Sequence, residues 1–132
     1  MSKRVWFYQQ MVGDSTLMAK LPGGIHSSTA LEIAPQEKPF VMYRNLSHRP
    51  GEVGDDTAIT KIEVYLVHVH DVPGDYLRIN SVLADLLRIF EGLKDKQEGV
   101  GRCTWVEDSE DFRDEDMGTI LRYARIEVRY LP

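Results

Sequence analysis

A period of two residues predicts two long strands. In residues 119–131, Ala124, Ile126 and Val128 alternate with Arg125, Glu127 and Arg129, as in a strand with one buried face. In residues 59–70 both sides of the alternation are partly apolar: Ile62, Val64, Leu66, His68 and His70 on one side, Tyr65, Val67 and Val69 on the other. We therefore expect 59–70 to lie centrally in a sheet, with protein covering part of each side.

A period of about three and a half residues predicts the main helix at residues 76–91. Its apolar stripe consists of Tyr76, Ile79, Val82, Leu83, Leu86, Leu87 and Phe90, while Arg78, Asp85 and Arg88 are expected to face solvent. Asp75 precedes the first turn, where a carboxylate is favoured, and Gly92 ends the helix. Residues 3–11 predict a shorter helix, followed by a short second turn capped by Asp14 or Ser15.

Residues 25–28, 40–46 and 102–106 predict the remaining strands, the first a short edge strand. We expect irregular connections at 29–39, 47–57, 94–101 and 107–116, which are rich in Pro, Gly or charge. The resulting order is α-β-β-β-α-β-β. The sequence thus predicts an α+β fold in a single domain spanning 1–132, with a mainly antiparallel sheet and helices packed on one face.

Charge and composition narrow the range of functions. The net charge of −5 argues against a general nucleic-acid binder, because phosphate contacts need a basic face. We expect no membrane association, since no stretch approaches the roughly 20 apolar residues of a membrane span, and we see no secretory signal. The lone Cys103 cannot form an intrachain disulfide, and we interpret it as a small apolar filler.

Two groups of side chains invite a metal-site interpretation. His68 and His70 project from the same face of one strand, but a third ligand would have to come from distant residues such as His26 or His48. Residues 107–116 hold seven carboxylates and one arginine, yet Phe112 occupies a ligand position of the calcium-binding EF-hand loop. We therefore expect no metal, no cofactor and no catalytic residue.

The same acidic stretch suggests an interface between subunits. Copies of the chain could associate head to tail if the acidic stretch of one meets the arginines of the last strand of another, and such contacts can close into a ring. The candidate interface residues are Glu107, Asp108, Glu110, Asp111, Asp114, Asp116, Arg122, Arg125 and Arg129.

The succession of segments resembles the tail terminator, or tail completion, proteins of long-tailed bacteriophages. The resemblance covers nearly the whole chain: a short N-terminal helix, Leu21-Pro22-Gly23-Gly24-Ile25, the strand Phe40-Val41-Met42-Tyr43, a helix introduced by Pro73-Gly74-Asp75-Tyr76, the acidic turn after Trp105-Val106, and Arg122-Tyr123-Ala124-Arg125.

This resemblance implies a non-enzymatic virion protein, made in the bacterial cytoplasm, that forms a hexameric ring at the head-proximal end of the tail. Such a ring stops polymerisation of the tail tube, contacts the tube protein and the head-completion proteins, and lets DNA pass without binding it specifically. Two alternatives stay open: another neck, head–tail connector or minor tail protein, and a small metal-dependent enzyme or ligand-binding domain that uses His68, His70 and the acidic stretch.

Overall fold

The computed structural model describes residues 3–28, 37–53 and 59–131. Its elements in chain order are α1 (Lys3–Val12), α2 (Ser15–Met18), β1 (Ile25–Ser27), β2 (Phe40–Val53), β3 (Ile59–Asp71), α3 (Leu77–Phe90), β4 (Val100–Asp108), β5 (Phe112–Asp114) and β6 (Thr119–Tyr130). The order agrees with the α+β prediction, with α2 and β5 as additional short elements.

The strands form one six-stranded sheet in the order β1-β2-β3-β6-β4, and β5 pairs with β6 beyond the end of β4. All pairs are antiparallel except β1 with β2. Strand β3 is central, as its two partly apolar faces predicted. The short β1 at one edge confirms the predicted edge strand.

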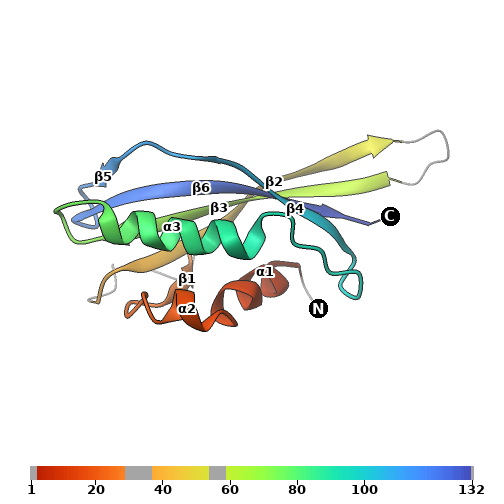
Figure 1. The fold of residues 1–132 in the computed structure, drawn as a ribbon. Coiled ribbons are helices and arrows are strands. Elements are labelled where there is room, and N and C mark those ends of the chain that lie inside the picture. The colour runs from red at the N-terminus through yellow and green to blue at the C-terminus, as the bar shows by residue number, and fades with distance from the viewer. Residues whose placement is uncertain (1–2, 29–36, 54–58, 132) are drawn as a thin grey trace.

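The helices of the described residues all lie on one side of the sheet, and none of them covers the other side (Figure 1). The core between the two layers is centred on Phe7 of α1, whose ring stacks on Tyr65 of β3 at 4.1 Å and on Phe90 of α3 at 4.5 Å between centroids. All three side chains are fully buried. This stack joins both long helices to the central strand, which confirms that the helices pack on one face.

The predicted connection at 47–57 is in fact partly strand. Residues 47–53 belong to β2, because pairing with β3 resumes at Ser47 opposite Val64 after a bulge and continues past Pro50. Proline is compatible with this position because, among the described residues, β1 covers β2 at residues 41–43 alone, so Pro50 lies on an edge segment. The predicted connection at 54–57, like most of that at 29–39, lies outside the described residues.

The acidic stretch 107–116 is not wholly irregular either. Glu107 and Asp108 end β4, and Phe112 to Asp114 form β5, which pairs with residues 119–121 of β6. Residue 118 is a glycine with a φ of +66°, a conformation that side chains rarely adopt, and it allows the tight return from β5 to β6. The backbone pairing of the acidic residues could not be read from their polarity.

Helix α3 follows its apolar stripe with two exceptions. Leu87 is exposed, and Asp85, expected in solvent, is buried, with its carboxylate 2.8 Å from the ammonium of Lys20 and 3.6 Å from Arg88. The reason is α2, which packs beside α3 and brings Lys20 over Asp85. The predicted cap of α2 is confirmed, since the amide of Leu17 donates to Asp14 at 2.9 Å.

The outer edge of β4 is occupied by the segment that follows α3. The amide of Cys103 donates to the carbonyl of Leu93 at 2.8 Å, and the amide of Gly92 donates to the carbonyl of Cys103 at 3.0 Å. The amide of Trp105 donates to the carboxylate of Glu91 at 2.6 Å. Edge strands with filled donors are poor templates for another strand. Within the described residues, no helix has the length and apolarity needed to cross a membrane.

We predict that Phe7→Ala lowers the free energy of unfolding by about 3–5 kcal/mol, because it empties the centre of the aromatic stack. Urea denaturation monitored by circular dichroism measures this change. Leu77→Ala, at a side chain 72% exposed, is the control and should change stability by less than about 0.5 kcal/mol. Equal effects of the two substitutions would contradict the assigned core.

Candidate functional site

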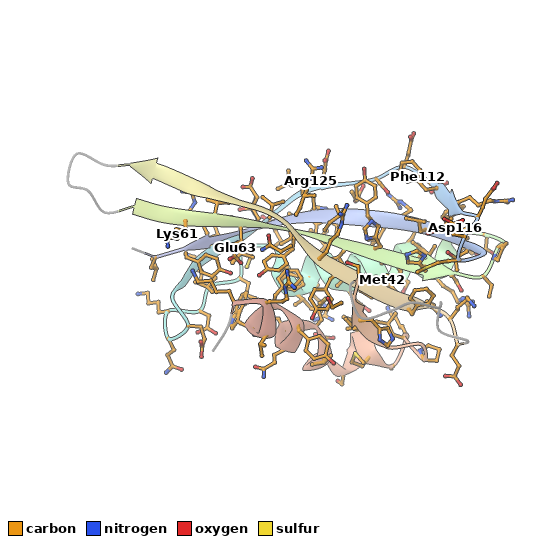
Figure 2. All side chains as sticks on the ribbon, turned by 180° about the vertical axis from the view of Figure 1, so that it is seen from behind. Met42, Lys61, Glu63, Phe112, Asp116 and Arg125 are labelled. Carbon is orange, nitrogen blue, oxygen red and sulfur yellow. The ribbon has the colours of Figure 1, made fainter. Side chains whose placement is uncertain are left out.

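The side of the sheet without helices, here called the open face, carries the candidate site. Cross-strand partners share a face, so the register places the rows Met42–His68–Tyr123 and Arg44–Leu66–Arg125 on it. Figure 2 shows this face, with Met42, Phe112 and Asp116 near one end and Arg125 further along the sheet. Leu66 is buried there without a helix above it, between two arginines.

Two adjoining hollows form a groove across the open face at the β5 end. The first, of about 410 Å³, is lined by His68, Phe112, Arg113, Asp114, Glu115, Asp116, Leu121 and Tyr123. The second, of about 460 Å³, is lined by Ser28, Met42, Arg44, His68, His70, Asp114, Met117 and Leu121. Because His68, Asp114 and Leu121 border both, we treat the hollows as one feature and call it the groove.

The two histidines of the groove are more enclosed than strand-end histidines would be. His70 is buried, stacks on Phe40 at 4.8 Å between centroids, and shares a 2.8 Å hydrogen bond between its Nδ1 and the Thr119 hydroxyl. His68 is half-buried, with the edge of its ring against Tyr123. Burial lowers the pKa of each to about 4, and the Asp114 carboxylate offsets only part of this effect. Both rings are therefore neutral at pH 7.

We would expect histidines near the end of a strand to be partly exposed, and His70 departs from this because it is buried. The described residues contain no group of three or more His, Cys, Asp or Glu side chains placed to hold a metal ion. Cys103 is fully buried, and burial raises the pKa of its thiol to about 12, so it packs as the small apolar residue that the sequence indicated.

Arg122 anchors the acidic stretch from the helix side of the sheet. Its guanidinium donates to the Ser109 carbonyl at 2.9 Å, to Asn80 of α3 at 2.5 Å and to the Asp108 carboxylate at 3.1 Å. The carboxylate of Asp111 lies 3.8 Å away. Arg122 faces α3 because it pairs with Val69, whose side chain belongs to the core.

The other candidate interface residues divide into paired and unpaired groups. Arg125 lies 3.5 Å from Glu107 on β4, so part of the predicted charge contrast is satisfied within one molecule. Asp114 accepts a hydrogen bond from the Met117 amide at 3.0 Å. Within the described part of the chain, Glu110, Asp116 and Arg129 take part in none of the ion pairs.

The aromatic part of the groove was not predicted from the sequence. The rings of Phe112 and Tyr123 stack at 5.8 Å between centroids, with an interplanar angle of 13°. Tyr123 could have been assigned to the open face from its place in the alternation of 119–131. Phe112 could not have been assigned to this face from the sequence, because its position depends on the pairing of β5 with β6. No local sequence pattern predicts that pairing.

Comparisons with known proteins give a structural likeness but no sequence family. No family model matches the chain, and no curated protein matches it. The fold is similar to that of a chain in a solved structure described as the virion of a native gene transfer agent particle. The TM-score is 0.72 over 95% of this chain and 91% of that chain, at 13% sequence identity. At this identity the likeness establishes a shared fold.

We predict that stability falls as the pH falls from about 6.5 to about 4. The pKa of His68 and of His70 is about 4 in the folded protein, against an ordinary value of 6.5. In that window the unfolded chain binds more protons than the folded protein, so acid favours unfolding. Urea midpoints at pH 7 and pH 5 should differ less in His68→Asn/His70→Asn than in the wild type. Equal pH dependence in both proteins would contradict the neutral, enclosed state of these rings.

We also predict that Arg122→Met releases the acidic stretch. The loss of a charged donor to the Ser109 carbonyl and the Asp108 carboxylate should cost about 1–3 kcal/mol and speed proteolysis within 107–116. Arg122→Lys, which keeps the charge but cannot reach three acceptors at once, should be intermediate. Unaltered cleavage of Arg122→Met under native conditions would show that the stretch is held by other contacts.

Proposed function

We propose that this protein is a structural component of a virion, and that it acts as a tail terminator. The observation that carries the proposal is the similarity of the fold, over nearly the whole chain, to a chain of a gene transfer agent virion. The order of segments, which resembles tail terminators of long-tailed phages, supports the same role. The protein would form a ring, most simply a hexamer, at the head-proximal end of the tail.

The filled edge of β4 is compatible with a protein that stops the growth of the tail tube. Glu91 and Leu93 occupy the amides of Trp105 and Cys103, so another strand cannot pair at these positions. Contacts with the tube protein on one side and the head-completion proteins on the other would then depend on side chains and loops. The net charge of −5 suits a ring through which DNA passes without being held.

A connector at the neck is the second candidate, because the same fold likeness would fit a protein on the head side of the joint. The two roles differ in what happens to the tail. Loss of a terminator leaves tube growth unchecked, whereas loss of a head-side connector leaves tails of normal length without heads. Neither role requires a catalytic residue, a cofactor or a metal.

We predict that particles assembled without this protein have tails of uncontrolled length that are not joined to DNA-filled heads. Electron microscopy of negatively stained lysates measures tail length and attachment directly, and supplying the protein in trans should restore both. Tails of normal length beside unattached heads would favour the connector. Normal, joined particles would rule out both roles.

A further inference from the structure

The groove has the composition of a binding site for a cationic side chain. Its first hollow is lined by the stacked rings of Phe112 and Tyr123 and by the acidic residues Asp114, Glu115 and Asp116 beside Arg113. The second hollow adds Arg44, so acidic residues outnumber arginines in the groove by three to two. His68 and His70 are neutral at pH 7 and add no positive charge. A guanidinium is attracted both by an aromatic face and by carboxylates at the rim.

The opposite end of the same face carries arginines in an unfavourable arrangement. Arg102 of β4 and Arg129 of β6 are direct register partners, so their side chains emerge side by side. Like charges opposite each other on neighbouring strands are destabilising. The carboxylate of Glu91 lies 3.8 Å from Arg102, and within the described residues Arg129 has no ion pair. An anionic surface placed over this pair would relieve the repulsion.

The groove and the arginine pair cannot meet within one molecule. Arg129 pairs with Ile62, whereas the groove lies at His68, six residues further along β3. At the rise of a β-strand this separation is about 20 Å, which is longer than an arginine side chain. Complementary charges that are held this far apart on one rigid sheet can be paired only between molecules.

We propose that the arginine pair Arg102–Arg129 of one copy docks into the groove of a second copy, with Asp114, Glu115 and Asp116 as its carboxylate partners. This deepens the proposed function, since a head-to-tail contact of this kind is heterologous and closes into a ring when the rotation between copies permits. Arg122 and Arg125 take no part in this contact, because they are paired with Asp108 and Glu107 inside each molecule.

The test is a charge exchange between the two surfaces of the full-length protein. Glu115→Lys/Asp116→Lys makes the groove repel arginine, and Arg102→Glu/Arg129→Glu makes the arginine pair repel the groove. Sedimentation velocity at millimolar protein and low salt should show assembled species for the wild type and loss of them in each double variant. A 1:1 mixture of the two double variants, and the variant carrying all four substitutions, should both recover assembly.

Circular dichroism should show that each variant is folded. The control is Glu37→Lys/Glu98→Lys, which makes the same change in net charge at exposed positions outside the groove. This control should assemble like the wild type. A wild type that stays monomeric, assembly that survives either double variant, or failure of the mixture to recover would each overturn the proposed contact. These outcomes are independent of the microscopy above, because unjoined heads and overlong tails would still support the terminator role if the copies met through another surface.

Discussion

The rest of the molecule depends on the aromatic stack in which Phe7 lies between Tyr65 and Phe90. Large rings bury more apolar area than any other side chains, and these three come from α1, β3 and α3. Their contact commits both long helices to the same side of the sheet. The open face is the direct consequence, since the helical material described in the structure lies on the side that the stack defines (Figure 1).

A sheet covered on one side only must stabilise its other side by different means. On the open face this is done by ring contacts such as Phe40 with His70, by the hydrogen bond between His70 and Thr119, and by long arginines that flank Leu66. The result is a surface that is partly apolar and strongly patterned in charge. Such a surface can serve recognition, because its polar groups are fixed before a partner arrives.

Much of the fold could be predicted from the sequence because its signals are periodic and local. The alternation in β6 assigned Ala124, Ile126 and Val128 to the core, and the stripe of α3 assigned Ile79, Val82 and Leu86. The failures share one cause, which is dependence on distant partners. Asp85 is buried because Lys20 reaches it from the turn after α2, and residues 47–53 are a strand because β3 continues to pair with them. For the candidate site, the alternation already separated Arg122 from Arg125 and Arg129, but the place of Phe112 beside Tyr123 depends on the pairing of β5 with β6.

The carboxylate of Glu91 on the amide of Trp105 has a consequence for the behaviour of the protein at high concentration. An accessible strand edge in a concentrated solution invites ordered aggregation through the backbone. With the β4 edge closed by its own chain at Cys103 and Trp105, encounters between copies at this edge are decided by side-chain chemistry. Association governed in this way is reversible and sensitive to ionic strength, so incorrect encounters can dissociate before they become permanent.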